Sequence, residues 1–290
     1  MNVFVYGTLR KGERNAYHLN DETCLHEQAW VNGSLYDTER GYPVIFLNKD
    51  GDASHKVYGE IYDINDKTLK VLDDLEGFVP GNPDNLYERT QVTAYTDQSG
   101  TVEDVITYVA GNTLKYAERN ISLGDWNVYN YFQKQDLYYF AYGSCMDDER
   151  FKQANVEKHF TDVVGRGVLK GYCMTFSRST DDGGKADIIE CENKVVEGVI
   201  YRVNMKAIEY LYHREGVYSN GYRPAILSVS SGQDQYRVLT FIGLDKKQET
   251  PPTDLYATEI IRGATGVLSV SYIEQVKERI AKLNEMKSHQ

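Results

Sequence analysis

Two short stretches decide the fold, because VFVYGTL at Val3–Leu9 returns as YFAYGSC at Tyr139–Cys145. Each stretch reads as an apolar strand that ends at a tyrosine and leads into a polar turn containing glycine. A turn motif of this length, found once, carries little information. Its return near the middle of the chain predicts that one fold is present twice.

Further motifs recur in the same order and strengthen the prediction of a repeat. GEIYDI is followed by LDDLEG in the first half, and GVIYRV is followed by LYHREG in the second. These motifs occupy Gly59–Ile64, Leu72–Gly77, Gly198–Val203 and Leu211–Gly216. The interval from the first glycine to the glutamate is the same in both halves. A repeat this long indicates tandem domains rather than the short units of a solenoid.

Length and composition fit a pair of ordinary globular domains. The chain has 290 residues, enough to bury two hydrophobic cores. Its net charge of −11 argues against a surface that follows nucleic-acid phosphates, because such a surface needs clustered Lys and Arg. No apolar stretch reaches the length of a transmembrane helix, so no membrane partner is expected. The sequence does not set the oligomeric state.

The distribution of Cys and His predicts chemistry without a cofactor. Cys24, Cys145, Cys173 and Cys191 form no CxxC pair, and the six histidines show no ligand spacing such as HExxH. No glycine-rich nucleotide loop is present, so neither a metal nor a cofactor is expected. The N-terminus enters its first motif without the basic region that begins a signal peptide. We therefore expect reduced thiols in a cytoplasmic protein.

Hydrophobic patterning predicts mostly strands, with a helix before each repeated glutamate. Strands are expected over 1–6, 31–36, 42–47, 57–64, 87–95, 102–109, 137–142, 168–177, 195–203, 223–229 and 236–242. Asn65 is expected to cap the helix that ends at Glu76, and Gly77 to stop it. The corresponding helix in the second half is expected over 205–214. A further helix is predicted over 270–286 at the end of the chain.

The organisation of the chain follows from these elements. Residues 114–135 are mostly polar and are expected to form a largely helical connector with a break at Gly124. This places the first domain at 1–136 and the second at 137–290. The glycine-rich stretch 181–193 is expected to be a loop. Strands dominate and helices intervene irregularly, which favours an α+β fold over a doubly wound sheet.

The repeated turn predicts an anion-binding site. A strand that ends in Tyr-Gly-Thr or Tyr-Gly-Ser can align several backbone N–H groups, which hold a carboxylate without a lysine. The alternative is a plain β-turn in which Gly7 and Gly143 only supply a permissive backbone. For one copy alone the plain turn is the better interpretation, and the second copy favours a functional turn.

The glutamate at the end of each predicted helix is the candidate general base. Glu76 and Glu215 stand in the last helical turn, where the helix dipole disfavours a negative charge. This unfavourable placement occurs in both copies, and a structural role does not explain it. A glutamate in a partly apolar cavity has a raised pKa and can accept a proton near neutral pH. A solvated surface glutamate is the alternative.

Other residues near these motifs are expected to be structural. His213 lies on a different helix face from Glu215 and is expected to be exposed. Cys145 has no visible base beside it, so it is not expected to be a nucleophile. Tyr87 and Tyr222 follow the two glutamates; packing is the expected role, and shaping the cavity is the alternative.

At this point both halves resemble the γ-glutamyl cyclotransferase fold family. The first half is similar to its AIG2-like and γ-glutamylamine cyclotransferase branch, through VFVYGTLRKGE, GSLYD, GYPV, GEIYD, LDDLEG and the GDW at Gly124–Trp126. The second half is similar to the γ-glutamylcyclotransferase branch proper, through YYFAYGS, GVIYRV, LYHREGV and the PPTDLYATEII at Pro251–Ile261. The resemblance implies a small mixed β-barrel with flanking helices in each half, around a cavity for a γ-glutamyl group.

The resemblance also implies roles for individual residues. Glu76 and Glu215 correspond to the general base of the family, and Tyr256 to a tyrosine that contacts the substrate. The residues expected to bind the amino-acid end of the substrate are Tyr6, Gly7, Thr8, Leu9, Tyr139, Phe140, Ala141, Tyr142, Gly143 and Ser144. The first half shows no equivalent of Tyr256. Cys145 occupies a position where asparagine is usual, which bears on loop polarity and substrate preference.

The implied reaction is an intramolecular aminolysis that yields 5-oxoproline. The α-amine of the substrate attacks its own γ-carbonyl, so the enzyme needs no nucleophilic side chain. Three alternatives stay open: a protein that binds a γ-glutamyl or carboxylate ligand without turnover, an enzyme with one active domain, and an interaction scaffold. A pure binder has no need of a carboxylate beside an anionic ligand, which favours catalysis.

Overall fold

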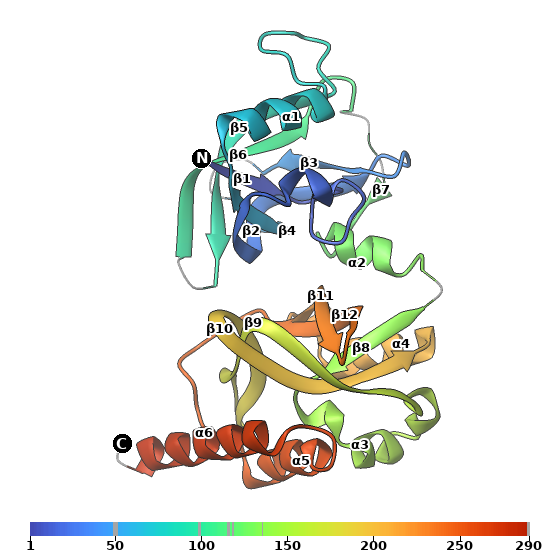
Figure 1. Cartoon of the computed structure of the whole chain (residues 1–290), viewed down its shortest axis with the longest axis vertical. Coiled ribbons are helices and arrows are strands. Elements are labelled where there is room, and N and C mark those ends of the chain that lie inside the picture. Colours follow the sequence, from blue (N-terminus) through green and yellow to red (C-terminus); the bar gives the residue numbers. More distant parts are fainter. Residues whose placement is uncertain (49–51, 98–99, 115–116, 118, 135, 289–290) are drawn as a thin grey trace. The chain divides into compact units, whose positions relative to one another are not determined.

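Each copy of the repeat forms its own five-stranded mixed barrel in the computed structural model, with helices around it (Figure 1). The structure describes residues 1–48, 52–97, 100–114, 117, 119–134 and 136–288. The chain divides into two compact units, Met1–Asn130 and Tyr131–Gln290. The tandem α+β fold expected from the repeated motifs is confirmed, whereas the boundary expected between residues 136 and 137 stays a prediction.

The first barrel is closed by the pairing of its fifth strand with its first. Its strands are β1 (Asn2–Val5), β2 (Thr23–Asp37), β4 (Lys56–Asp63), β5 (Tyr87–Thr96) and β6 (Gly100–Ala110). They follow the order β2-β4-β1-β6-β5, and β5 returns to pair with β2. β1 runs parallel to β6, and the other neighbours are antiparallel. Outside the barrel, β3 (Pro43–Leu47) and β7 (Arg119–Asn120) pair with the end of β2.

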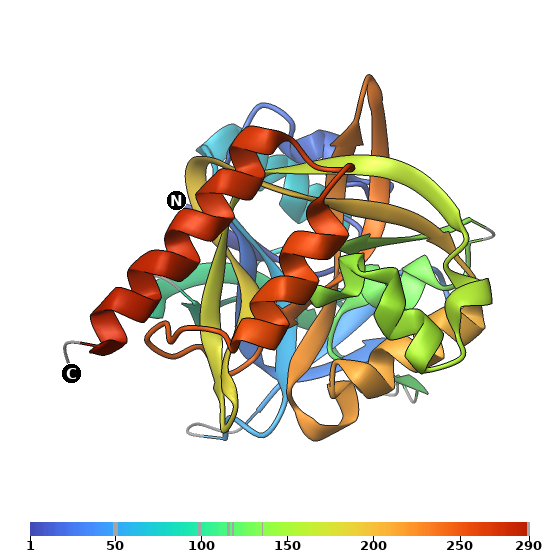
Figure 2. The same cartoon turned by 90° about the horizontal axis from the view of Figure 1, so that it is seen from below.

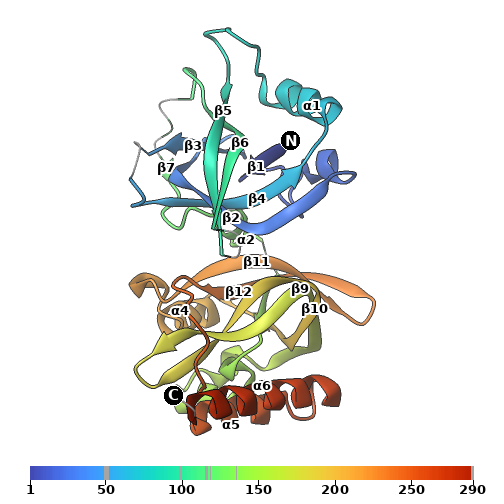
Figure 3. The ribbon, with the colours of Figure 1, turned by 90° about the vertical axis from the view of Figure 1, so that its left-hand side faces the viewer.

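The second barrel repeats the first strand for strand. Its strands are β8 (Leu137–Ala141), β9 (Asp162–Thr180), β10 (Gly183–Val203), β11 (Tyr222–Ser231) and β12 (Asp234–Gly243). The closed order is β10-β8-β12-β11-β9, with β8 parallel to β12 as β1 is to β6. Figure 3 shows how far the long strands β9 and β10 curve together around this unit.

Helices cover the second barrel more extensively than the first. The first unit has α1 (Asp66–Glu76), α2 (Trp126–Tyr131) and the short turn η1 (Ala16–Leu19). The second unit has α3 (Asp148–Gln153), α4 (Met205–Arg214), α5 (Asp254–Ala264), α6 (Val270–Ser288) and the short turns η2 (Ser144–Met146), η3 (Glu157–His159) and η4 (Val217–Ser219). Figure 2 shows α5 and α6 side by side on this unit. No helix among the described residues is long and apolar enough to cross a membrane.

The first glycine of the repeated motifs GEIYDI and GVIYRV is required because the backbone of a neighbouring strand lies close to it. A Cβ atom at Gly59 would lie 2.4 Å from the carbonyl oxygen of Val5, and one at Gly198 would lie 2.3 Å from that of Ala141. Only glycine permits this spacing between β4 and β1, or between β10 and β8. The motif therefore fixes the strand that leads into each repeated turn.

The helix that ends in each repeated glutamate begins and stops as the sequence predicts. The Asn65 side chain accepts hydrogen bonds from two backbone N–H groups at the start of α1, and Asn204 accepts one at the start of α4. Gly77 and Gly216 follow the glutamates with φ of 66° and 61°, in the left-handed region. Each helix thus places its last residues at the equivalent edge of its own barrel.

Two expectations about irregular segments were wrong. The stretch 181–193 is not a loop, because β10 begins at Gly183. A Cβ atom at Gly184 would lie 2.1 Å from the carbonyl oxygen of Thr250, so glycine there serves close packing rather than flexibility. The connector 114–135 is not largely helical: it contains β7 and the short α2, and residues 115, 116, 118 and 135 lie outside the described residues.

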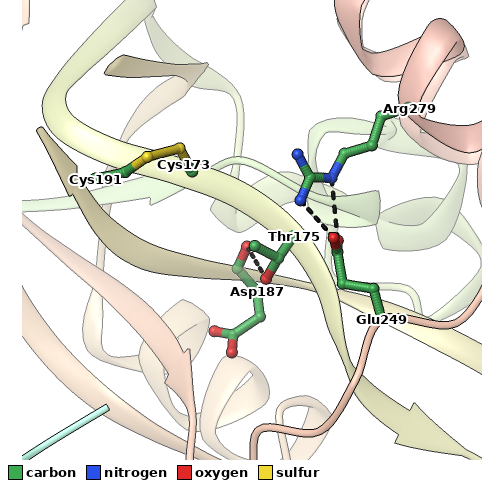
Figure 4. Close-up of a disulfide and its surroundings, with 6 residues drawn as sticks. All are labelled: Cys173, Thr175, Asp187, Cys191, Glu249 and Arg279. Carbon is green, nitrogen blue, oxygen red and sulfur yellow. Dashed lines mark hydrogen bonds and ion pairs between the residues drawn. A yellow bond between two sulfur atoms is a disulfide. The ribbon is translucent and has the colours of Figure 1, made fainter. Parts of the chain in front are cut away.

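Two cysteines that were expected to be reduced are paired. A disulfide joins Cys173 of β9 to Cys191 of β10, whose Cα atoms lie 5.4 Å apart (Figure 4). The antiparallel pairing of these long strands brings the two residues together, which their sequence spacing alone does not reveal. Cys24 and Cys145 do not take part in this disulfide and are thiols, as expected.

Candidate active sites

Each unit holds a pocket where the repeated turn meets the repeated helix end. The first cavity has a volume of about 190 Å³ and is lined by Tyr6, Gly7, Thr8, Leu9, Arg14, Tyr42, Pro43, Glu76, Tyr87 and Tyr108, among others. The second has a volume of about 330 Å³ and is lined by Tyr139, Tyr142, Gly143, Ser144, Cys145, Arg178, Lys185, Arg214, Glu215 and Tyr256, among others. Of the predicted site residues, Phe140 and Ala141 alone are not on these walls; both are buried in β8.

The tyrosine of each repeated turn is fixed by the same hydrogen bond. The Tyr6 hydroxyl donates to the carbonyl oxygen of Tyr108 at 2.7 Å, and the Tyr142 hydroxyl donates to that of Phe241 at 2.5 Å. Both acceptors lie on the strand parallel to the one that the tyrosine directly follows. This bond pins the strand end from which the turn begins.

The two turns also fold alike. The N–H of Arg10 donates to the carbonyl oxygen of Gly7 at 3.1 Å, and the N–H of Met146 donates to that of Gly143 at 3.1 Å. Neither glycine has a positive φ, so neither is needed for a left-handed backbone. The anion-binding role of these turns stays a prediction.

The turn glycines are needed because another strand crowds them. A Cβ atom at Gly7 would lie 2.8 Å from Pro43 Cγ, and one at Gly143 would lie 3.1 Å from Ala186 Cβ. Pro43 and Ala186 therefore occupy equivalent places, on β3 and on the first part of β10. Sequence reasoning missed both residues, because nothing in the motifs indicates which strand packs over the turn.

Tyr87 and Tyr222 hold these crowding residues in place and also line the pockets. The Tyr87 hydroxyl donates to the carbonyl oxygen of Pro43 at 2.6 Å, and the Tyr222 hydroxyl donates to that of Ala186 at 2.7 Å. The two tyrosines, expected mainly to pack, thus also shape the cavities, which was the alternative. Their matched bonds confirm that the two pockets are copies of one design.

Glu76 is a half-buried carboxylate at the wall of the first pocket. Burial raises its pKa to about 7, because the charged form loses solvation there. Within the described part of the chain, no cation forms an ion pair with it. A carboxyl group in this state exchanges a proton readily near neutral pH, as a general base must.

Glu215 has a more polar environment in the second pocket. Burial raises its pKa, and the Arg214 guanidinium, a hydrogen bond from Cys145 and the charge of Arg178 oppose that rise. The thiol of Cys145 donates to Glu215 Oε1, with Sγ 3.4 Å away. Arg214 Nε donates to the same sulfur at 3.1 Å, and Nη2 to the Ser144 hydroxyl at 3.3 Å. Arg214 therefore ties the turn to the helix end, a role that the sequence did not indicate.

Tyr256, at the start of α5, lies beside the second turn. Its hydroxyl accepts a hydrogen bond from the Ala186 N–H at 3.2 Å and lies 3.6 Å from where a Cβ atom of Gly143 would stand. The described part of the first unit has no counterpart of α5. There, Asn15 reaches the turn instead, with Nδ2 donating to the Thr8 hydroxyl at 3.0 Å.

A buried charge cluster supports the first turn from behind. Arg10 is 3% exposed, and its guanidinium donates to Glu60 Oε1 at 3.2 Å and to Asp125 Oδ1 at 2.8 Å. Asp125 is the central residue of the GDW motif, so the motif anchors the segment that follows the turn. Among the described residues, no group of three or more His, Cys, Asp or Glu is arranged to hold a metal ion.

Comparison with family models separates the same two halves. The model described as gamma-glutamyl cyclotransferase, AIG2-like, matches residues 3–128. A second model, described as the AIG2-like family, matches residues 195–276. Both repeated glutamates fall inside the matched segments.

Similar proteins extend the match to the whole chain. YkqA of Bacillus subtilis is 39% identical over 284 residues, which covers 97% of this chain and 98% of YkqA. The crystal structure of YkqA matches with a TM-score of 0.86 over the same shares of each chain. The gamma-L-glutamyl-butirosin B gamma-glutamyl cyclotransferase of Niallia circulans is 40% identical over 129 residues, 44% of this chain and 76% of that protein. The gamma-glutamylaminecyclotransferase A of Danio rerio is 37% identical over 100 residues, 32% of this chain and 57% of that protein. The chain therefore belongs to the AIG2-like γ-glutamyl cyclotransferase family.

Proposed function

We propose that the chain is a γ-glutamylcyclotransferase that releases 5-oxoproline from γ-glutamyl amino acids or γ-glutamyl amines. The observation that carries the proposal is one constellation present twice. Glu76 and Glu215 are half-buried carboxyl groups of raised pKa, each in a pocket beside a tyrosine–glycine turn. The names of the relatives from Niallia circulans and Danio rerio support the substrate class. The partner is a small molecule rather than a nucleic acid.

In the proposed mechanism, the substrate supplies its own nucleophile. Its α-amine attacks the γ-carbonyl carbon, the new C–N bond closes a five-membered lactam, and the bond to the leaving nitrogen breaks. The amine is an ammonium ion at pH 7, so it must lose a proton before it attacks. Glu76 or Glu215 accepts that proton and returns it to the leaving nitrogen, which contributes roughly 10²- to 10⁴-fold in rate. Holding the substrate in a ring-closing conformation lowers the barrier further.

The turns are proposed to bind the amino-acid end of the substrate. Backbone N–H groups of the segments 6–9 and 142–144 can donate hydrogen bonds to its α-carboxylate and polarise the carbonyl oxygen. Tyr139 and Tyr256 complete this end of the second pocket. The chemistry needs neither a metal nor a cofactor, because the base and the nucleophile are both provided.

The competing function is binding without turnover. It requires a ligand to remain intact after incubation with the protein, whereas the proposed enzyme converts it to 5-oxoproline and a free amine. A panel of γ-glutamyl amino acids and γ-glutamyl amines, with 5-oxoproline as the readout, tests the difference. Release of 5-oxoproline from no compound in the panel would leave the binding function as the better account.

The two units are proposed to prefer different leaving groups. The first carries YGTL and the second YGSC, and the second cavity is the larger and has more cations on its wall. We expect γ-glutamyl amines to be substrates of the first site and γ-glutamyl amino acids of the second. Comparison of Glu76→Gln with Glu215→Gln on both classes tests this. If Glu76→Gln leaves every activity intact, only one domain is active, which was the alternative.

The proposed location is the cytoplasm, and the disulfide provides its test. A reducing cytoplasm holds Cys173 and Cys191 as thiols, although the structure pairs them. Alkylation inside intact cells, followed by mass measurement of the peptides, should therefore find both thiols blocked. Recovery of the intact disulfide from such cells would contradict a reducing location.

A further inference from the structure

We propose that Arg178 selects the leaving group in the second pocket by binding a carboxylate on it. This inference rests on the proposed function and deepens it, because it assigns specificity to one residue. Arg178 belongs to β9 and lines the same cavity as Glu215. Its partner across the strands is Lys185 of β10, which also lines that cavity.

Two like charges directly opposite one another on neighbouring strands destabilise a sheet. Asp182 compensates one of them, since its carboxylate oxygen lies 2.7 Å from Lys185 Nζ. Among the described residues, no carboxylate forms an ion pair with Arg178. The charge of Arg178 acts on Glu215 without forming an ion pair with it, so a bound anion would further offset the repulsion between Arg178 and Lys185.

The guanidinium of Arg178 is nevertheless held in a fixed position. Its Nε donates to the carbonyl oxygen of Gly221 at 3.1 Å, and its Cζ lies 4.9 Å from the centre of the Tyr222 ring. These contacts orient the planar group and leave its Nη donors available. A guanidinium in this state is suited to a carboxylate, which it can bind through two parallel hydrogen bonds.

The other cations of the cavity wall are already engaged. Arg150 forms an ion pair with Glu259, and Arg214 donates to Cys145 and Ser144. Lys185 is paired as described above. Arg178 is therefore the cation on this wall that, within the described part of the chain, has no anionic or side-chain acceptor.

The first pocket has neutral residues at the two equivalent positions, although Arg14 also lines it. Pro43 and Ala186 are equivalent, so the residues before them, Tyr42 and Lys185, are equivalent as well. Across the strands from Tyr42 stands Thr38, whose N–H donates to the Tyr42 carbonyl oxygen at 3.3 Å. The position of Arg178 thus corresponds to Thr38 in the first unit.

This contrast indicates which part of the substrate the two positions meet. The turn, its tyrosine and the glutamate are the same in both pockets, so they suit the γ-glutamyl part that all substrates share. The second pocket has Arg178 and Lys185 on its wall, whereas the first has Tyr42 at the place of Lys185, and Thr38 is not among its described lining residues. These positions therefore suit the part that varies. That part is the leaving group, which carries a carboxylate when it is an amino acid and none when it is a simple amine.

The test uses the full chain with Glu76→Gln, so that the second site alone turns over. γ-Glutamyl-alanine is compared with γ-glutamyl-alaninamide, which has the same shape without the negative charge. Arg178→Gln should lower kcat/KM for the acid about 10- to 100-fold, mainly through KM, because a hydrogen bond to a charged group contributes about 1.5–3 kcal/mol. The amide should change less than about threefold, within the scatter of uncharged contacts.

Two further variants make the result specific to this position. Arg166→Gln removes another arginine of β9 that does not line the cavity, and it should leave both substrates unaffected. Arg178→Lys keeps the charge and should retain part of the preference for the acid. If Arg178→Gln does not fold, Arg178→Lys takes its place in the comparison of the acid with the amide.

Equal losses for the acid and the amide in Arg178→Gln, or no preference in the unsubstituted site, would overturn the assignment. Failure of the proposed function looks different, because the protein then releases no 5-oxoproline from either compound. In that case, calorimetric titration of γ-glutamyl-alanine still decides on Arg178. Binding of the acid that Arg178→Gln does not weaken would contradict its role.

Discussion

The thiol of Cys145 lies between Glu215 and Arg214, with Sγ 3.4 Å from the carboxylate oxygen and 3.1 Å from the guanidinium Nε. The first unit has Leu9 at the equivalent place in its motif, and Glu76 has no comparable support. The same carboxylate is therefore held in two ways within one chain. The second has a hydrogen-bond donor and cations that lower its pKa, whereas burial raises the pKa of the first within the described part of the chain.

Glu215→Gln is expected to abolish activity on γ-glutamyl amino acids in the full chain. The substitution keeps the size of the side chain and removes the proton acceptor, so a loss of at least about 100-fold in kcat is expected. The midpoint of thermal unfolding should change little. Glu209→Gln, on the exposed side of the same helix, is the control and should behave as the unsubstituted protein. Retention of more than about a tenth of kcat in Glu215→Gln would rule out its role as base.

The activity of the first site should rise with pH through neutrality. Burial raises the pKa of Glu76 to about 7, and only the ionised form accepts a proton. In a Glu215→Gln background, kcat/KM for a γ-glutamyl amine should increase about tenfold per pH unit below that pKa and level off above it. A rate that is independent of pH between 5 and 8 would show that Glu76 is not the titrating base.

The same raised pKa predicts a pH-dependent gain in stability for Glu76→Gln. The folded state holds the Glu76 proton more tightly than the unfolded state, so ionisation destabilises the fold as pH rises from about 4.5 to about 7. Glu76→Gln should therefore raise the unfolding temperature at pH 8 relative to the unsubstituted chain, and should not do so at pH 4. Equal effects at the two pH values in scanning calorimetry would contradict the shift.

Cys145→Ala is expected to move the pH profile of the second site to higher pH. The hydrogen bond from Cys145 lowers the pKa of Glu215, so its removal lets burial raise that pKa further. Burial also raises the pKa of the thiol itself to about 11, so it stays protonated and able to donate at neutral pH. Cys145→Ser keeps a donor and should stay close to the original profile. The profiles are measured as kcat/KM against pH in the Glu76→Gln background, and coincident profiles would exclude a role for the thiol.

Asp125→Ala should destabilise the first unit strongly. It leaves the buried Arg10 guanidinium with less compensation, and breaking a buried ion pair costs roughly 3–5 kcal/mol. Calorimetry should show an earlier unfolding transition, together with loss of activity on γ-glutamyl amines. Asp84→Ala, at an exposed aspartate, is the matched control. Unchanged unfolding in Asp125→Ala would mean that the GDW motif does not anchor the turn.

Local signals in the sequence were sufficient for the parts of each site that belong to one motif. The cap at Asn65, the stop at Gly77 and the helix before Glu215 follow from short-range chemistry, and the structure bears them out. The cap at Asn204 was not predicted, although the same chemistry explains it. The repetition of the motifs gave them a meaning that a single copy lacks. This is why the fold class and the candidate bases could be predicted before any geometry was known.

The missed residues depend on contacts between distant segments. Lys185 lies in a glycine-rich stretch that composition assigns to a loop, and its pairing with Arg178 exists only because β10 begins at Gly183. The crowding of Gly143 by Ala186 requires the register of the same pair of strands. The disulfide between Cys173 and Cys191 has the same origin. The register of this pair shifts between Lys185 and Asp187 and again between Glu190 and Val195, so alternation along one strand does not reveal which residues face each other.

The parallel pairing of the first and last barrel strands also has a consequence for how the chain folds during synthesis. β1 is flanked by β6, and β8 by β12, so neither barrel can close until its final strand has left the ribosome. Contacts between such distant segments form slowly, because a long loop must be ordered before they contribute. The first barrel, by contrast, can be completed while the second is still being translated. An amino-terminal fragment that stops short of Gly100 should therefore remain unfolded, and nascent chains should gain protease resistance in two separate steps.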